Sequence, residues 1–385
     1  MENLNKVIEI ALRENEIPYA AYGVTNKNQT LASGSIGHTD LQKINSLNPN
    51  SIFRIASMTK PLTSTALMLL AREKNINLET PVENYLAEFK NIKVAKLIDG
   101  EIFYSKPETK ITLHQLLTHT SGFGYDFHHE TLSHLLVNKK IAGLADKEGK
   151  FLNTPLVEHP GKYWHYGIGL GWIGKFIEKL SETSLNDFMT KKIFTPLDMK
   201  DTSFDVSLLG EHRLPSVFLK KERASLVDIS EHMPSPQMNE FAYGGGGLFS
   251  TPKDYLKFIR LFLNGGKVDG KQFLPEEIIM KMTSNQIGDL DVPFQPTFNS
   301  TLCAPNEWFP GVKKKWGYGF MINTADIPGR RSNSSCAWSG ILNTFFWFDL
   351  KKDIGGTIMM QMYPCYHEDT KKIFKKFEEH IYSSI

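Results

Sequence analysis

The alternation of apolar and polar residues predicts secondary structure at both ends of the chain. The first residues after Met1 have an amphipathic pattern with the period of a helix. Residues 19–25 and 30–37 are two short strand-like runs joined by a polar turn, a pattern typical of an antiparallel hairpin. The last segment, residues 369–382, is again amphipathic with helical spacing. We therefore expect a helix and a hairpin at the beginning and a helix at the end.

The middle of the chain has a different pattern. From residue 78 to about residue 243, helical periodicities alternate with Gly and Pro turns, and strand-like runs are few. Short β-rich runs return at residues 317–323, 343–349 and 355–362. Strands at both ends with helices between them predict one sheet that is built from both ends of the chain and covered by the terminal helices.

This order of elements predicts an α+β fold with two domains. The first is a discontinuous sheet domain formed by residues 1–78 and 246–385. The second is a mainly helical domain, residues 79–245, inserted into the first. Any cleft is expected between the sheet and the helical insert.

Composition narrows the class of protein. The 385 residues are 41% hydrophobic and 22% charged, which is enough for two sizeable cores and too apolar for general disorder. A net charge of +2 argues against nucleic acid or an anionic membrane as the main partner. No apolar window reaches the length of about eighteen residues that a membrane span needs. The first residues lack the apolar core of a signal peptide, so we expect a cytoplasmic location.

Several residue patterns argue against a metal or nucleotide cofactor. Cys303, Cys336 and Cys365 are widely spaced, which predicts free, buried thiols and neither a disulfide framework nor a zinc site. The adjacent histidines in residues 128–130 point apart in a helix or a strand. The glycines of residues 169–174 fit a dinucleotide fingerprint, but no apolar strand precedes them, and they more plausibly allow close helix packing. No cofactor is therefore expected.

Ser57 and Lys60 carry the most informative chemistry in the chain. They lie three residues apart at the start of an expected helix, so the lysine amine can reach the serine hydroxyl. A serine needs a base to act as a nucleophile, and a desolvated lysine with a lowered pKa can take its proton. This is the arrangement of the Ser-x-x-Lys acyl-transfer enzymes. A plain helix start fits the same residues, so the motif alone leaves both interpretations open.

A second Ser-x-x-Lys match, at residues 250–253, predicts the start of a helix. Ser250 or Thr251 can cap the helix, and Pro252 suits its first position. Apolar residues then follow at helical spacing. We therefore expect a structural role for this match. The four glycines of residues 244–247 lack the Lys and Ser/Thr of a phosphate loop and predict a tight backbone approach near a site.

Taken in order, several motifs resemble one enzyme family. They are Ser57 to Lys60, the segment 113–122 that ends in His-Thr-Ser-Gly, Pro160-Gly161 with Tyr166, the glycines 244–247, and Trp338-Ser339-Gly340. With these motifs the chain resembles the serine hydrolases of the class C beta-lactamase superfamily. The likeness is greatest to family VIII carboxylesterases and to acyltransferases of the simvastatin-synthase type, and it runs from about residue 5 to residue 382. The resemblance implies a beta-lactamase/transpeptidase-like fold, an antiparallel sheet flanked by helices.

The resemblance also implies catalytic roles. Ser57 would be the acylated nucleophile and Lys60 its general-base partner. Tyr166 would relay protons to and from the leaving group, with Tyr163 as a rival whose spacing from the Pro-Gly pair fits less well. Whether Lys60 or Tyr166 is the base stays open at this point, because the titration of two coupled groups belongs to the pair.

Residues 338–341 would match the strand that lines the family's active site. The backbone N–H groups of Ser57 and Ile341 would form the oxyanion hole, and Trp338, Ser339 and Gly340 would shape the substrate pocket. Beta-lactamases begin this strand with a cation and a threonine that hold the antibiotic's carboxylate, whereas this chain has a tryptophan and a serine. The asparagine that beta-lactamases carry after the tyrosine is missing as well. Both departures favour an uncharged ester or thioester over a beta-lactam.

These observations predict a serine hydrolase, a carboxylesterase that forms an acyl-enzyme at Ser57 from small or medium acyl esters and releases it to water. An acyltransferase that moves the acyl group to a metabolite alcohol or amine is the nearest alternative, followed by a weak beta-lactamase or peptidase. A non-catalytic binding protein on the same fold is an alternative of another class. The joint presence of Ser57, Lys60 and Tyr166 argues against it. The expected partner is a small-molecule ester or acyl substrate, and neither nucleic acid nor membrane.

Overall fold

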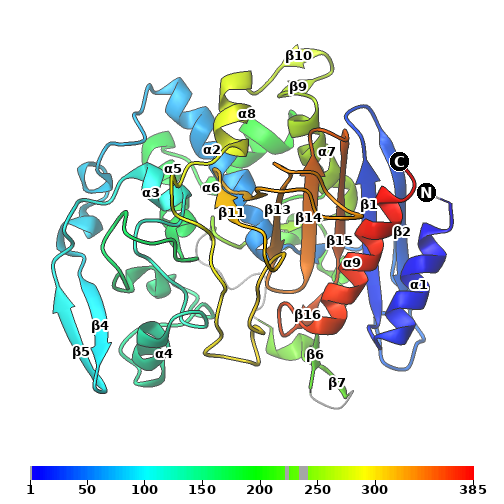
Figure 1. Ribbon diagram of the computed structural model, residues 1–385, viewed down its shortest axis with the longest axis horizontal. Helices are drawn as coiled ribbons and strands as arrows, with labels where there is room; N and C mark the ends of the chain where they lie inside the picture. The colour runs from blue at the N-terminus through cyan, green and yellow to red at the C-terminus, as the bar shows by residue number, and fades with distance from the viewer. Residues whose placement is uncertain (1, 222–224, 234–241) are drawn as a thin grey trace.

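A central antiparallel sheet organises the molecule. The computed structural model describes residues 2–221, 225–233 and 242–385. The sheet has seven strands in the order β11-β12-β13-β14-β15-β1-β2 (Figure 1). They are β1 (Tyr19–Thr25), β2 (Thr30–Gly37), β11 (Lys314–Trp316), β12 (Met321–Asn323), β13 (Cys336–Gly340), β14 (Thr344–Asp349) and β15 (Ile354–Met359). Since β1 pairs with both β2 and β15, the predicted hairpin and the predicted union of both chain ends in one sheet are confirmed.

Helices cover both faces of this sheet. On one face lie α1 (Leu4–Glu14) and α9 (Glu368–Tyr382), which contact each other near the two chain ends (Figure 1). On the other face lies α7 (Pro252–Leu263). The side chains of β14 alternate accordingly: Phe345 and Trp347 pack on α9, whereas Phe346 and Phe348 pack on α7. Because both faces are covered, every residue of β14 and β15 is buried.

The middle of the chain is mainly helical but contains more strand than expected. Its helices are α3 (Leu113–Leu117), α4 (Glu130–Val137), α5 (Gly169–Ser181) and α6 (Leu185–Met189). The hairpin of β4 (Val94–Ile98) and β5 (Glu101–Ser105) projects from this region (Figure 1). A small sheet pairs β6 (Phe218–Lys220) with β7 (Leu226–Asp228) and with β16 (Met362–Tyr363). The proposed division into residues 1–78 with 246–385 and residues 79–245 stays a prediction.

Four more short strands and one more α-helix lie outside these units in the described residues. They are β3 (Phe53–Arg54), which pairs with β8 (Phe249–Ser250), the hairpin of β9 (Lys267–Val268) and β10 (Lys271–Gln272), and α8 (Glu276–Thr283). No helix in the described parts of the chain combines the length and the apolar composition needed to cross a bilayer.

The second Ser-x-x-Lys match, at residues 250–253, and the glycine-rich segment 169–174 have the structural roles expected of them. The second Ser-x-x-Lys match is the start of α7: Thr251 caps the helix by accepting a hydrogen bond from Asp254 N, and Pro252 is its first residue. The glycine-rich segment 169–174 begins α5 without a preceding strand. A Cβ atom on Gly171 would lie 2.6 Å from the Tyr243 ring, so the glycines allow close packing, as predicted.

Candidate active site

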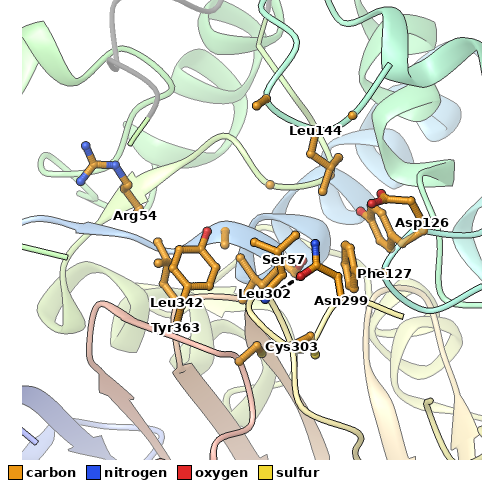
Figure 2. A pocket seen from close by; sticks show the side chains of 18 of the residues that line it. Arg54, Ser57, Asp126, Phe127, Leu144, Asn299, Leu302, Cys303, Leu342 and Tyr363 are labelled. Atoms are coloured by element: carbon orange, nitrogen blue, oxygen red, sulfur yellow. Dashed lines mark hydrogen bonds between the residues drawn. The ribbon is translucent and has the colours of Figure 1, made fainter. Parts of the chain in front are cut away.

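Ser57 lies in a short 3-10 turn, η1 (Ala56–Met58), directly before α2 (Thr59–Glu73). The preceding residue, Ala56, has a φ of 44°, a left-handed conformation that costs a residue with a Cβ atom about 1–2 kcal/mol. Neighbouring elements hold the turn in place: the Tyr255 hydroxyl donates to Met58 O at 2.9 Å. The turn directs the Ser57 side chain into a cavity while α2 leads away behind it (Figure 2).

Lys60 is fully buried in the first turn of α2. Its Nζ lies 3.0 Å from Ser57 Oγ, 3.0 Å from the Tyr125 hydroxyl and 2.6 Å from Gly245 O. Burial lowers the pKa of Lys60 well below its usual value. None of the carboxylates that the structure describes forms an ion pair with it. A neutral amine satisfies these contacts, because two N–H groups can serve Gly245 and Tyr125 while the lone pair faces the Ser57 hydroxyl.

Tyr166 meets Ser57 from the other side. Its hydroxyl lies close enough to Ser57 for that side chain to influence its pKa, and it accepts a hydrogen bond from Trp338 Nε1 at 3.0 Å. Burial raises the pKa of Tyr166, so this side chain remains a protonated phenol. Tyr163, the rival for this place, is 59% exposed, whereas Tyr166 is 8% exposed. The structure therefore brings Tyr166 together with Ser57 and Lys60.

Sequence reasoning missed two further tyrosines. The hydroxyls of Tyr125 and Tyr243 lie 2.7 Å apart, and Tyr125 also contacts Lys60. Burial raises the pKa of both phenols. A signal was present, because Tyr125 follows the His-Thr-Ser-Gly motif by three residues. The pair extends the hydrogen-bonded chain from Lys60 to the cavity wall, which Tyr243 lines.

The glycine run 244–247 makes the tight approach that its composition predicts. Gly245 O accepts from Lys60, and Gly244 O accepts from Thr63 Oγ1 at 2.7 Å, so the run lies directly along α2. A Cβ atom on Gly244 would lie 2.8 Å from Leu170 O of α5. Glycine is required here because α2 and α5 enclose the run from two sides.

The end of β13 lies against the turn that carries Ser57. A Cβ atom on Gly340 would lie 2.4 Å from Ile55 O, so only glycine allows this contact. Among the residues expected to shape the pocket, Ser339 lines the cavity together with Ile341. Trp338 is buried behind Tyr166 and packs on Trp316 with ring centroids 4.7 Å apart. Trp338 thus contacts the tyrosine, and Gly340 contacts the backbone before the nucleophile.

The cavity in front of Ser57 has a volume of about 560 Å³ and mostly apolar walls (Figure 2). Its size suits a small-molecule substrate. Three charged side chains line it, Arg54, Asp126 and Asp146. Burial lowers the pKa of Arg54 and raises the pKa of Asp126, since each is partly removed from water. Within the described ranges no carboxylate lies in ion-pair distance of Arg54.

The residues considered as metal ligands have other contacts. His128 Nδ1 lies 2.7 Å from Pro296 O, and the ring of His129 packs on His165, so the two neighbouring histidines point apart. Among the described residues, no group of three or more His, Cys, Asp or Glu side chains could hold a metal ion. Cys303, Cys336 and Cys365 are free and buried, as predicted.

Comparisons with known proteins agree with this geometry. The family model described as Beta-lactamase matches residues 4–372. The ML-236A carboxylate methylbutanoyltransferase of Penicillium citrinum is 25% identical over 406 residues, which cover 100% of this chain and 95% of that protein. The lovastatin esterase of Penicillium rubens is 26% identical over 340 residues, which cover 81% of this chain and 80% of that protein. Unliganded simvastatin synthase from Aspergillus terreus has a TM-score of 0.81 at 22% identity, covering 99% of this chain and 97% of that one. The last comparison confirms the beta-lactamase/transpeptidase-like α+β fold.

Proposed function

The chain belongs to the Beta-lactamase family, and on that premise we propose that it is a serine carboxylesterase acting on small or medium acyl esters. The observation that carries the proposal is the meeting of Ser57, Lys60 and Tyr166 at one mostly apolar cavity. A related esterase and a related acyltransferase support the same class of acyl chemistry.

In the proposed reaction, neutral Lys60 takes the hydroxyl proton as Ser57 Oγ attacks the ester carbonyl carbon. The oxyanion that forms is stabilised by the backbone N–H groups of Ser57 and Ile341. Tyr166 donates its proton to the leaving alcohol oxygen, and the Lys60 ammonium returns a proton to the tyrosinate. A water molecule then attacks the acyl-enzyme, and the acid leaves as Ser57 regains its proton. This division of roles follows from the pKa directions, which favour a neutral amine and a protonated phenol.

Acyl transfer to an alcohol or amine is the second candidate function. The cavity volume of about 560 Å³ leaves room beside a short acyl chain for an acceptor. Arg54 offers a charge-assisted hydrogen bond to an anionic group on such an acceptor or on the acyl donor. One relative is named as a methylbutanoyltransferase, and 95% of its length aligns with this chain.

Hydrolysis of p-nitrophenyl acetate and butyrate by the wild type and by Ser57→Ala, with intact-mass analysis, tests the proposal. We expect an acyl adduct in the wild type, and a loss of turnover in the variant of at least about 10³-fold. Ser250→Ala is the matched control, because Ser250 belongs to the second Ser-x-x-Lys match and lies outside the cavity. Turnover or adduct that persists in Ser57→Ala would refute the proposal.

Added acceptors separate the two candidate functions. After rapid acylation, a deacylation rate that is the same with and without short alcohols and amines favours the esterase. A rate that rises with acceptor concentration and yields the new ester or amide favours the acyltransferase.

A further inference from the structure

Cys303 and Cys365 both line the substrate cavity, and Figure 2 shows Cys303 in its wall. They are partners in a parallel β-bridge: Cys365 N donates to Leu302 O at 2.8 Å, and Ala304 N donates to Cys365 O at 2.8 Å. Directly opposite residues of a parallel bridge direct their side chains to the same side. The two thiols accordingly lie close enough to shift each other's pKa.

The two sulfur atoms have different environments. The neighbouring Cys365 thiol, together with His128, whose Nε2 lies 3.9 Å from Cys303 Sγ, lowers the pKa of Cys303. Burial and the same thiol pairing raise the pKa of Cys365 well above its usual value. A thiolate beside a protonated thiol is the arrangement of peroxide-reactive cysteine pairs, in which one sulfur attacks and the other resolves.

The pair also contacts the strand end next to the nucleophile. The Cys365 thiol donates a weak hydrogen bond to Gly340 O, with a sulfur–oxygen distance of 3.7 Å. The next residue, Tyr366, shares a hydrogen bond of 2.7 Å with Ser339 Oγ. Gly340 and Ser339 lead directly to Ile341, the proposed oxyanion donor. A change in the bonding of Cys365 therefore acts on the segment that would stabilise the reacting carbonyl.

We propose that Cys303 and Cys365 form a dithiol site that a peroxide oxidises to a disulfide, and that this disulfide slows turnover at Ser57. The Cys303 thiolate attacks one peroxide oxygen, the O–O bond breaks, and a sulfenic acid and hydroxide form. The Cys365 sulfur then attacks the sulfenic sulfur, an S–S bond forms and water leaves. In total two thiols and one hydrogen peroxide give one disulfide and two waters. The effect on turnover rests on the proposed function, whereas the thiol chemistry does not.

The geometry makes this pair the reactive thiols of the chain. Both cysteines line a cavity that admits small molecules, although they are buried from the outer surface. Cys336 lies on β13 outside the cavity lining, and burial raises its pKa, so it should stay reduced. Disulfide formation removes the S–H that donates to Gly340 O and ties residues 299–303 to the segment that carries Tyr366.

Peroxide treatment of the native protein, followed by alkylation and mass analysis, tests the proposal. We expect the wild type to lose two hydrogen atoms, with the disulfide mapped between the peptides of Cys303 and Cys365. Cys336→Ser should behave the same, and Cys303→Ser should form no intramolecular disulfide. The mapping in the wild type needs no variant, so poor folding of Cys303→Ser would not prevent a decision. Oxygen addition without an S–S bond, or a disulfide that involves Cys336, would overturn the dithiol site.

Turnover of p-nitrophenyl butyrate is measured on the same samples. We expect kcat to fall about fivefold on oxidation, because part of the oxyanion stabilisation is lost. It should recover fully with a dithiol reductant. A mapped disulfide with unchanged kcat would overturn the proposed coupling to Ser57. If the reduced protein turns over no ester at all, the failure belongs to the proposed esterase function, and the mass analysis still decides whether the dithiol site exists.

Discussion

Burial determines which proton each candidate catalytic side chain can hold. Lys60 lies in the interior without a described carboxylate partner, so its neutral form is favoured, while Tyr166 is kept protonated by the same loss of solvation. Each unit of pKa shift corresponds to about 1.4 kcal/mol of preference between the two protonation states. The pair is therefore set for proton transfer from Ser57 to Lys60 and from Tyr166 to a leaving group. For the choice of base that the sequence left open, we therefore propose Lys60.

The first prediction concerns pH. Because the active form contains neutral Lys60, kcat/KM should fall as pH drops through the lowered folded-state pKa of this lysine. On the alkaline side no loss is expected up to about pH 10, since burial raises the pKa of Tyr166 above its usual value near 10. Lys60→Arg should lose at least about 100-fold in kcat, because a guanidinium stays protonated. Initial rates across the pH range provide the measurement, and an acid limb that persists unchanged in Lys60→Arg would refute the assignment.

The second prediction separates Tyr166 from its sequence rival. Tyr166→Phe removes the proton donor to the leaving oxygen, so ethyl butyrate hydrolysis should fall by about 10²–10⁴-fold. Hydrolysis of p-nitrophenyl butyrate should fall far less, because p-nitrophenolate leaves without being protonated. Tyr163→Phe is the matched control, and its exposed side chain predicts wild-type rates for both esters. Equal losses for the two esters in Tyr166→Phe would show that the tyrosine acts in some other way.

Among the elements, those with local sequence signals were predictable. The hairpin of β1 and β2, the cap of α7 and the pairing of Ser57 with Lys60 all depend on residues close in sequence. The contacts of Lys60 with Tyr125 and Gly245 join residues 65 and 185 positions apart, and no local pattern specifies them. They arise only when the sheet and the middle of the chain pack together.

The hairpin of β4 and β5 was missed although a signal existed. Its turn is Asp99-Gly100, and both residues have positive φ, 51° and 85°, as in a type I′ turn. Strand β5 is largely exposed and β4 is buried only at Val94 and Ala95, whereas every residue of β1 is buried. Burial therefore leaves little apolar signal in the hairpin of β4 and β5. In this region the residues of the turn indicated the two strands more strongly than the pattern of apolar residues did.

The third prediction concerns how α9 is held to the sheet. Arg331 and Glu378 form a fully buried, bidentate ion pair, with Nε–Oε1 at 2.8 Å and Nη2–Oε2 at 2.9 Å. Arg331→Met should lower the free energy of unfolding by about 3–5 kcal/mol, because it leaves the Glu378 charge buried with a poorer partner. Urea unfolding measures this loss.

An exposed ion pair on the same helix is the control. Lys376 of α9 contacts Glu14 of α1 at 2.6 Å with both side chains about half exposed, so Lys376→Met should change the free energy of unfolding by less than about 1 kcal/mol. The double variant Arg331→Met with Glu378→Met should recover most of the loss, since it removes both charges. Equal effects of the buried and the exposed pair would contradict this account of α9.

At the scale of the whole molecule, the cavity is formed by segments far apart in sequence. Ser57, Ser339 and Tyr363 come from the two end regions of the chain, while Tyr125 and Leu144 come from its middle. Ser57 and Leu144 lie on opposite sides of the space in Figure 2. Of the proposed catalytic residues, Ser57 and Lys60 lie in η1 and α2, whereas Tyr166 comes from the middle of the chain. The proposed catalytic groups thus come from both regions, whereas Leu144 belongs to the wall that limits the dimensions of the cavity.

The fourth prediction tests this role of Leu144 through substrate length. Leu144→Trp adds volume to the cavity wall opposite Ser57 without touching Lys60 or Tyr166. For p-nitrophenyl esters, kcat/KM should therefore stay within about twofold for acetate and fall at least about tenfold for hexanoate, since each CH₂ excluded from an apolar site loses about 0.8 kcal/mol. Leu208→Trp is the control, because Leu208 is 70% exposed and lies outside the cavity lining. A uniform loss across all chain lengths would mean that the substitution disturbs the proposed catalytic residues themselves, and the role of Leu144 as a wall that limits substrate size would then be wrong.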